Sequence, residues 1–239
     1  MIEMNTNMSK LTSAVYMFQS CTNLQTFKGD LSSLTDGSDM FYNCKKLKNF
    51  TNTGNFDKLT KGYYMFHSCK SLEEFNYDLP SITNCKYMFY SSGLKSISSN
   101  INPSVTDGDD MFYGCERLTN IDIDLSHFTK GSWMFNDCKS LQTFSKNLTS
   151  LKTATSMFSD CTSLTSFESD LTNLEDGTQM FWGATNLSHF RGNLGKLKKG
   201  TLMFRDCCLD GDSVEQILTT IPTVTNSPEL SLYVQESGV

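Results

Sequence analysis

Apolar and polar positions along this chain repeat with a period of about 23 residues. The pair Met-Phe marks the period and occurs nine times. Its methionines are Met17, Met40, Met65, Met88, Met111, Met134, Met157, Met180 and Met203. Each period holds six apolar positions, which in the first full copy are Met17, Phe18, Leu24, Phe27, Leu31 and Leu34. Neither the period of a helix nor the alternation of a strand fits all six. The pattern predicts a coil of short extended segments and tight turns whose apolar side chains point at one axis.

A period that recurs so regularly indicates a repeat architecture. A single coil would expose its apolar side chains on both sides, and stacking against neighbouring coils removes that exposure. Burying each such side chain stabilises the fold by roughly 1.5–3 kcal/mol. We therefore expect a solenoid over residues 17–208, a partial coil over residues 1–16 and a cap over residues 209–239.

The repeated motif, Cys-x-x-Leu-x-x-Phe followed by Leu-x-x-Leu-x-x-Gly-x-x-Met-Phe, resembles the BspA-like class of bacterial leucine-rich repeats over about residues 8–208. That family usually has alanine where this chain has methionine, which implies a bulkier core at that corner. The resemblance implies a leucine-rich-repeat solenoid of about nine coils, each with a short parallel strand on one face and a short helical turn on the other. It also implies a surface or secreted binding protein of bacteria, or a related phage-encoded protein.

Seven of the nine cysteines take the same place, three residues after the phenylalanine of the pair. This cysteine ladder comprises Cys21, Cys44, Cys69, Cys115, Cys138, Cys161 and Cys207. Two copies carry Ser92 and Ala184 there, which a disulfide framework would not tolerate easily, and zinc sites typically need Cys-x-x-Cys pairs. We interpret the ladder as buried small side chains whose S–H groups donate weakly to the neighbouring coil, with a disulfide or a metal as the alternatives.

An aspartate or asparagine precedes the fifth apolar position of every copy, and the two residue types alternate. This Asx ladder comprises Asn7, Asp30, Asn55, Asp78, Asn100, Asp124, Asn147, Asp170 and Asn193. Such side chains accept from the backbone N–H two residues on, which suits a tight corner. We expect the amides to donate to carboxylates of neighbouring coils, and calcium is the alternative ligand. Glycine three residues before the methionine is expected to supply a positive φ at a turn. Ala14, Cys85 and Ala154 take this place in other copies, which indicates that small size matters there as well.

The two ends of the chain differ. Residues 210–222 predict a helix with Asp212 or Ser213 as N-cap and an apolar face that includes Ile217. Alternating leucines at residues 229–234 predict a strand, so that residues 209–239 would cap the solenoid. The N-terminal end offers no amphipathic cap. It therefore suggests a fragment of a longer protein, a docking edge, or a homodimer through an open edge.

Composition narrows the functional classes. The chain has 239 residues, a formal net charge of −6, 38% hydrophobic and 19% charged residues, so we expect neither disorder nor membrane insertion. No basic stripe is evident in the sequence, which disfavours nucleic acid as partner. The first ten residues do not have the pattern of a signal peptide. The three histidines take three different slots and no catalytic motif is present, so we expect no enzyme, no cofactor and no metal site.

Two surfaces are candidates for ligand binding. Aromatic residues flank the Met-Phe pair and would align into a stripe: Tyr42, Tyr63, Tyr64, Tyr87, Tyr90, Tyr113, Trp133 and Trp182. Outward residues of the expected strands vary between copies: Gln25, Lys48, Glu73, Thr119, Gln142 and Ser188. Rings that merely cover the neighbouring coil are the alternative reading of the stripe, and the resemblance favours the strand face.

We predict a non-catalytic binding module for a protein or glycan, on a bacterial surface or a phage particle. The alternatives are a structural spacer that self-associates through its N-terminal edge, and an intracellular protein-interaction module, which free cysteines would suit.

Overall fold

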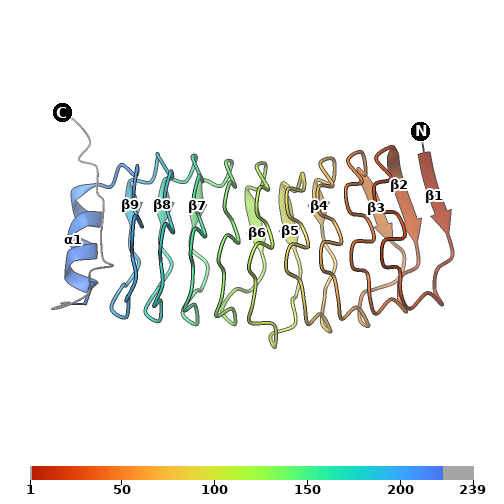
Figure 1. Cartoon of the computed structure of the whole chain (residues 1–239), viewed down its shortest axis with the longest axis horizontal. Helices are drawn as coiled ribbons and strands as arrows, with labels where there is room; N and C mark the ends of the chain where they lie inside the picture. The colour runs from red at the N-terminus through yellow and green to blue at the C-terminus, as the bar shows by residue number, and fades with distance from the viewer. Residues whose placement is uncertain (1, 223–239) are drawn as a thin grey trace. The chain divides into compact units, whose positions relative to one another are not determined.

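The computed structural model describes residues 2–222, and it divides into two compact units. Within the described residues, the first unit comprises residues 2–105 and 111–123, and the second comprises residues 106–110 and 124–222. Each unit is a stack of coils, as Figure 1 shows. No helix within residues 2–222 is long and apolar enough to cross a lipid bilayer.

The first unit carries two parallel sheets with one strand from each coil. β1 (Ile2–Thr6), β2 (Leu24–Gly29) and β3 (Asn49–Asn52) form one sheet. β4 (Glu74–Phe75), β5 (Ser96–Ser98) and β6 (Asn120–Asp122) form the other. The pairing Phe27↔Phe50 keeps equivalent residues of successive coils in register. The stacked coils and parallel strands confirm the predicted leucine-rich-repeat solenoid.

The second unit repeats this arrangement and adds a helix. Its strands are β7 (Thr143–Phe144), β8 (Ser166–Phe167) and β9 (His189–Phe190), all parallel, and they are followed by α1 (Gly211–Thr220). The phenylalanines of successive strands stack directly, with ring centroids 5.8 Å apart between Phe144 and Phe167. The predicted apolar positions of the repeat form the core of each unit, except for Met17, which lies at the N-terminal edge and is exposed.

The corner opposite the strands is a run of turns, where a short helical turn was expected. In every coil the residue before the methionine and the residue three after it have positive φ, as in Tyr64 (54°) and Ser68 (57°). For residues other than glycine this conformation is unfavourable by roughly 1–2 kcal/mol. The turns direct backbone N–H groups at carbonyls of the next coil, for example from Phe41 to Met65 at 3.0 Å. Those hydrogen bonds between coils replace the helical ones.

The glycines that precede the methionine do not have positive φ, so that prediction was wrong. They are small because the methionine of the next coil lies over them. A Cβ atom on Gly37 would stand 3.0 Å from Met65 Sδ, and one on Gly131 would stand 3.2 Å from Met157 Cε. The bulky methionine and the missing side chain are therefore complementary features of adjacent coils.

Helix α1 covers the free edge of β9. Its N-cap is Asp210, not Asp212 or Ser213, because the Asp210 carboxylate accepts from the Ser213 N–H at 2.8 Å. The buried Ser213 hydroxyl accepts from the Phe190 N–H at 2.8 Å and donates to the Ser188 carbonyl at 3.1 Å. A side chain thus satisfies the backbone groups that a further strand would pair. The strand predicted at 229–234 lies outside the described residues.

Candidate functional site

Aromatic side chains of the first unit form one continuous group on the corner of the coils. We call it the ring array, and it comprises Tyr42, Tyr63, Tyr64, His67, Tyr87, Tyr90 and Tyr113. Four of its members occupy the position after the Met-Phe pair and stack in a row. Ring centroids are 4.6 Å apart for Tyr42 and His67, 4.7 Å for His67 and Tyr90, and 4.5 Å for Tyr90 and Tyr113. The coil spacing imposes this stacking, because equivalent positions lie above one another.

A second row lies beside the first and comes from residues that precede the methionine. Tyr63 and Tyr64 are 4.2 Å apart, and Tyr64 lies 4.8 Å from Tyr87. Contacts of 5.2 Å between Tyr64 and His67 and of 6.0 Å between Tyr87 and Tyr90 join the two rows. Seven rings from four successive coils therefore form one surface.

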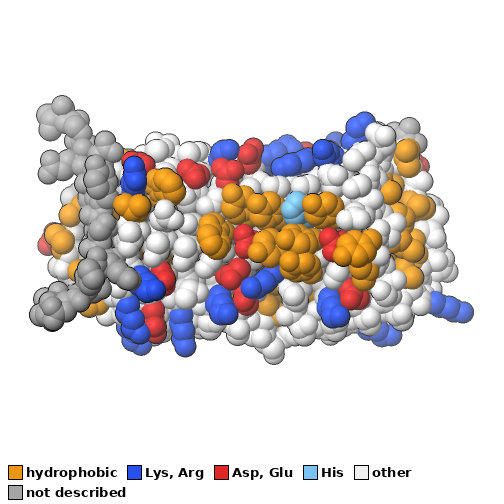
Figure 2. All heavy atoms as spheres, in the orientation of Figure 1, with side chains coloured by type: hydrophobic (Ala, Val, Ile, Leu, Met, Phe, Trp, Pro, Cys, Tyr) orange, Lys and Arg blue, Asp and Glu red, His pale blue; other side chains and the backbone are white. Residues whose placement is uncertain are grey.

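The ring array is half-buried, so it is neither core nor fully solvated surface. Figure 2 shows hydrophobic side chains gathered in a band on the viewed face. Neighbouring rings cover both faces of His67 and Tyr90, which leaves their edges toward solvent. Within the described part of the chain, the hydroxyls of Tyr42, Tyr63 and Tyr113 have no hydrogen-bond partner. The array therefore offers apolar edges and free hydroxyls.

His67 is the member that sequence reasoning missed. It takes the same place in its coil as Tyr42, Tyr90 and Tyr113, directly after the Met-Phe pair, and that shared place is the signal in the sequence. Burial, and secondarily the charge of Lys70, lowers the pKa of His67 from 6.5 to about 4. Its Nδ1 atom is buried without a hydrogen-bond partner. At neutral pH His67 is thus an uncharged ring in a row of rings.

The lowered pKa of His67 predicts a specific loss of stability in mild acid. Between pH 6.5 and pH 4 the unfolded chain binds a proton at this side chain that the folded chain does not, so the free energy of unfolding falls across that window and levels off below it. The His67→Phe variant cannot bind this proton, so we expect it to lose roughly 1–2 kcal/mol less stability than the parent. Solvent screening of the half-exposed ring keeps the difference below the value that the pKa shift alone would give. Urea denaturation at pH 7 and pH 4 measures the difference, and parallel losses in both proteins would contradict it.

Trp133 and Trp182 are not part of the ring array. Both lie in the second unit and are exposed. The Trp182 indole N–H donates to the Asp206 carboxylate at 3.2 Å, and Arg205 lies 5.8 Å from the ring centroid. The predicted stripe therefore consists of a group of tyrosines in one unit and two separate tryptophans in the other.

The residues of the predicted strand face are divided between the units in the same way. Gln25, Lys48, Glu73 and Thr119 belong to the first, whereas Gln142 and Ser188 belong to the second. Glu73 accepts from Lys95 at 2.9 Å and from Arg117 at 3.2 Å, and these contacts lower its pKa.

The cysteine thiols contact the backbone of the preceding coil. Cys44 Sγ donates to the Phe18 carbonyl at 3.1 Å, and the equivalent bonds of Cys69, Cys115, Cys161 and Cys207 measure 3.1–3.2 Å. None of the nine cysteines, all of which lie in the described part of the chain, forms a disulfide. Burial raises the pKa of Cys44 to about 12 and that of Cys115 to about 11, which makes these thiols unreactive. Cys21 is exposed, since the described residues before it form only a partial coil, without the Phe carbonyl that accepts from the later thiols.

The Asx ladder makes local turns rather than bonds between coils. Asp30, Asp124 and Asp170 each accept from the backbone N–H two residues on, at 2.9 Å. Pro80 has no N–H, so Asp78 accepts from the backbone and side-chain nitrogens of Asn100 instead. Within residues 2–222 this is the one bond of the ladder in which an amide donates to a carboxylate of another coil. Such bonds therefore do not explain why aspartate and asparagine alternate along the ladder. No group of three or more His, Cys, Asp or Glu side chains in that range could hold a metal ion.

One parallel strand per coil, a period of about 23 residues and a terminal helix define a leucine-rich-repeat solenoid. Residues 86–210 match the family described as "BspA type Leucine rich repeat region" in six copies, and they make up more than half of the chain. The chain therefore belongs to the BspA-type leucine-rich repeat family. Residues 7–123 also match the family described as "Mycoplasma protein of unknown function, DUF285".

Solved structures of bacterial leucine-rich repeat proteins are similar to this chain. One from Eubacterium ventriosum has 19% identity and a TM-score of 0.36, with 92% of this chain and 77% of that chain covered. One from Bacteroides ovatus has 17% identity and a TM-score of 0.38, with 93% and 82% covered. A search of curated proteins gave no match.

Proposed function

We propose that this protein is a non-catalytic binding module that recognises another protein through the ring array. The observation that carries the proposal is the continuity of seven half-buried rings over four coils. Tyrosine and other large aromatic side chains dominate the energetics of protein interfaces, because they supply apolar area together with a polar group. A contiguous surface of this kind on a repeat protein fits a binding role better than a purely structural one.

Ring geometry favours a protein over a glycan as ligand. Sugars stack on exposed faces of aromatic rings, whereas His67 and Tyr90 have both faces covered by their neighbours. The groups directed outward are ring edges and the hydroxyls of Tyr42, Tyr63 and Tyr113. Hydrogen bonds from these hydroxyls to a partner, around an apolar centre, are typical of protein contacts. A glycan ligand remains an outcome that the following experiment separates.

We expect labelled protein to bind saturably to at least one member of a panel of bacterial and epithelial cells, measured by flow cytometry. Changing Tyr42, Tyr63 and Tyr113 together to Ser should reduce binding by at least about tenfold, because each lost anchor costs about 1–2 kcal/mol. Changing the same residues to Phe keeps the rings, removes only the hydroxyls and should give an intermediate loss.

Trp182→Ser is the matched control, because it removes an exposed ring from the second unit. Its binding should equal that of the parent protein. Treating the cells with protease should abolish binding, and treating them with glycosidases should not. Equal binding by the parent and the Ser variant would move the site away from the ring array.

We propose display on a bacterial cell surface or a phage particle, from the resemblance to surface-displayed BspA-like repeats. Nine cysteines without a disulfide fit an intracellular interaction module as well, because thiols persist in reducing compartments. Antibody labelling of intact cells distinguishes the two, since only a displayed protein is stained without permeabilisation.

Assembly through the N-terminal edge is a second candidate function. Ile2, Tyr16 and Met17 are large side chains at this edge, with 54%, 57% and 46% of their surface exposed. In later coils four corner carbonyls accept N–H groups of the preceding coil, as the carbonyls of Asp36, Ser38, Met40 and Tyr42 do. The equivalent carbonyls of the first coil, those of residues 13, 15, 17 and 19, have no donor among the described residues. The edge therefore offers apolar surface and acceptors to a partner.

Alkylation of Cys21 tests this assembly directly. In dilute native protein we expect Cys21 to react with iodoacetamide well before Cys44, whose pKa is raised to about 12. If the edge associates, Cys21 should become protected as the protein concentration rises, while the half-buried Cys208 keeps its rate. Mass spectrometry of the alkylated peptides follows both sites. A Cys21 rate that does not depend on concentration would exclude assembly through this edge.

A further inference from the structure

The parallel pairing of the first unit is interrupted between β3 and β4. The coil that contains β3 is two residues longer than the usual period, since Met40 and Met65 are 25 positions apart. The buried Asn52 side chain shapes the added residues: its Oδ1 accepts from the N–H groups of Leu31 at 3.0 Å and Gly54 at 3.1 Å. The longer coil is therefore an ordered feature of the structure.

An extra ring holds the two strands apart. The Phe56 ring lies 6.4 Å from Phe50 and 6.3 Å from Phe75, with planes inclined by 3° and 20°. In the preceding pair of coils Phe27 and Phe50 stack directly at 5.6 Å. Phe56 thus takes the place between Phe50 and Phe75 that the inward side chain of another strand would take. The core beneath the interruption is filled, while the backbone above it is open.

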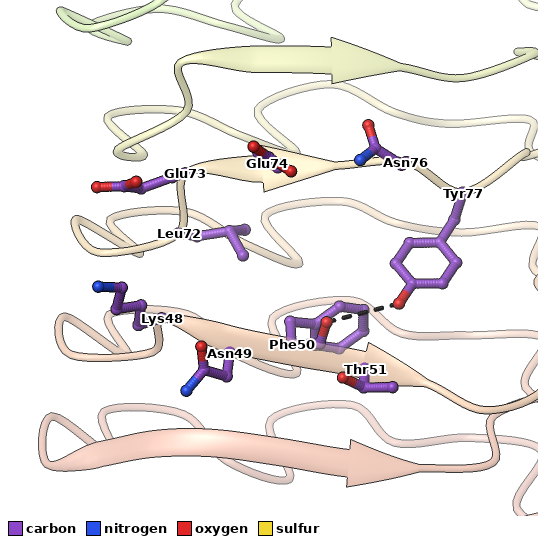
Figure 3. A pocket seen from close by; sticks show the side chains of 9 residues that line it. All are labelled: Lys48, Asn49, Phe50, Thr51, Leu72, Glu73, Glu74, Asn76 and Tyr77. Carbon is purple, nitrogen blue, oxygen red and sulfur yellow. Dashed lines mark hydrogen bonds between the residues drawn. The ribbon is translucent and has the colours of Figure 1, made fainter.

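The hydroxyl of Tyr77 stands where backbone groups of a neighbouring strand would be. It accepts from the Asn52 N–H at 3.1 Å and lies 3.5 Å from the Phe50 carbonyl, a long contact (Figure 3). In neighbouring coils the Lys48 N–H donates to the Gln25 carbonyl and the Lys95 N–H donates to the Glu73 carbonyl. Within the described residues, no equivalent bond joins the Glu73 N–H to the Lys48 carbonyl.

A groove of about 450 Å³ marks this interruption on the strand face, and residues 48–51 form one wall while the segment 72–77 forms the other (Figure 3). Lys48 and Glu74 lie on opposite walls, and neither has an ion-pair partner within residues 2–222. The groove therefore combines unpaired backbone groups with one free positive and one free negative charge.

We propose that this groove binds a short extended peptide segment, which adds a strand along the free edge of β3. The Lys48 carbonyl lacks a donor and the Glu73 N–H lacks an acceptor. A peptide main chain carries both kinds of group at the spacing of a strand. The site is separate from the ring array, so it does not depend on the proposed function above.

The lining also sets the sequence of the peptide. The rings of Phe56 and Tyr77 fill the space beneath the groove. Peptide residues that face inward therefore have to be small: Gly, Ala or Ser. Outward side chains are free, and an acidic residue near Lys48 together with a basic residue near Glu74 would complete two ion pairs.

An array of eight-residue peptides provides the test, with Gly, Ala or Ser at alternate positions and varied charges between them. We expect a subset to bind the full chain in fluorescence anisotropy, and alternate N-methylation of those peptides to abolish binding, because it removes main-chain donors and keeps the side chains. Tyr77→Phe removes the competing hydroxyl and should strengthen binding about tenfold, the equivalent of one hydrogen bond.

Trp182→Phe is the control outside the groove: it also keeps an aromatic ring and removes one hydrogen-bonding group, and it should bind with the affinity of the parent. Thermal unfolding of both variants confirms that they are folded. Failure of every peptide to bind, binding that survives N-methylation, or binding that Tyr77→Phe leaves unchanged would each overturn the proposal. Binding of neutral oligosaccharides in place of peptides would also overturn it.

Discussion

Replacing Gly93 with alanine is expected to destabilise the first unit by about 3 kcal/mol or more, since it forces a backbone shift in a packed interior. A Cβ atom at this position would overlap the Lys70 carbonyl oxygen and stand 2.7 Å from its carbonyl carbon. Lys70 belongs to the preceding coil, and the Gly93 N–H donates to the Cys69 carbonyl beside it at 3.0 Å. The obstacle is therefore backbone, which cannot turn aside as a side chain can. Urea denaturation followed by circular dichroism measures the change.

Gly211→Ala is the control for this substitution. Gly211 is the first residue of α1, and no atom lies within 4 Å of a Cβ placed there. Alanine has the higher helix propensity, so this variant should be unchanged or more stable by up to about 1 kcal/mol. Similar free energies of unfolding for the two alanine variants would contradict the close approach at Gly93.

Changing Phe56 to leucine should also destabilise the protein, although leucine is the usual residue of the repeat at this position. The ring bridges Phe50 and Phe75 across the widened interval, and a leucine side chain would leave part of that space empty. We expect a loss of about 1–2 kcal/mol for Phe56→Leu and about 3–5 kcal/mol for Phe56→Ala. The same denaturation experiment measures both.

The Phe56→Leu result decides between two views of the longer coil. If leucine were neutral or stabilising, the coil would follow the ordinary repeat and β3 would approach β4. If leucine is destabilising, the interval between the strands is a packed feature, as the position of the Phe56 ring indicates.

Much of the fold follows from the sequence because the chain repeats itself. Nine copies of one pattern identify the buried positions, because an apolar residue that recurs in every coil packs against the same place of the neighbouring coil each time. Parallel strands follow as well, because coils that stack in register bring the same residue to the same face. The aromatic positions of the first unit could be located in the same way, apart from His67.

Features that depend on a contact between two particular coils could not be read from one copy. One copy of the repeat indicates that the residue at Gly37 has to be small, but it does not show that the constraint comes from Met65 of the next coil. The N-cap of α1 is Asp210 because Ser213 is taken up by the edge of β9. The Asx ladder suggested bonds between coils, and the nearer backbone N–H groups compete successfully for those side chains.

The sequence by itself determined the period, the family, the buried residues and the direction of the strands, because each of these is a property shared by all copies. Only the tertiary structure decided which residues of different coils meet: the stacked rings around His67, the methionine over glycines such as Gly37, and the interval held by Phe56 and Tyr77. The physical reason is that these contacts depend on the spacing between coils, and two added residues or one missing residue changes that spacing locally.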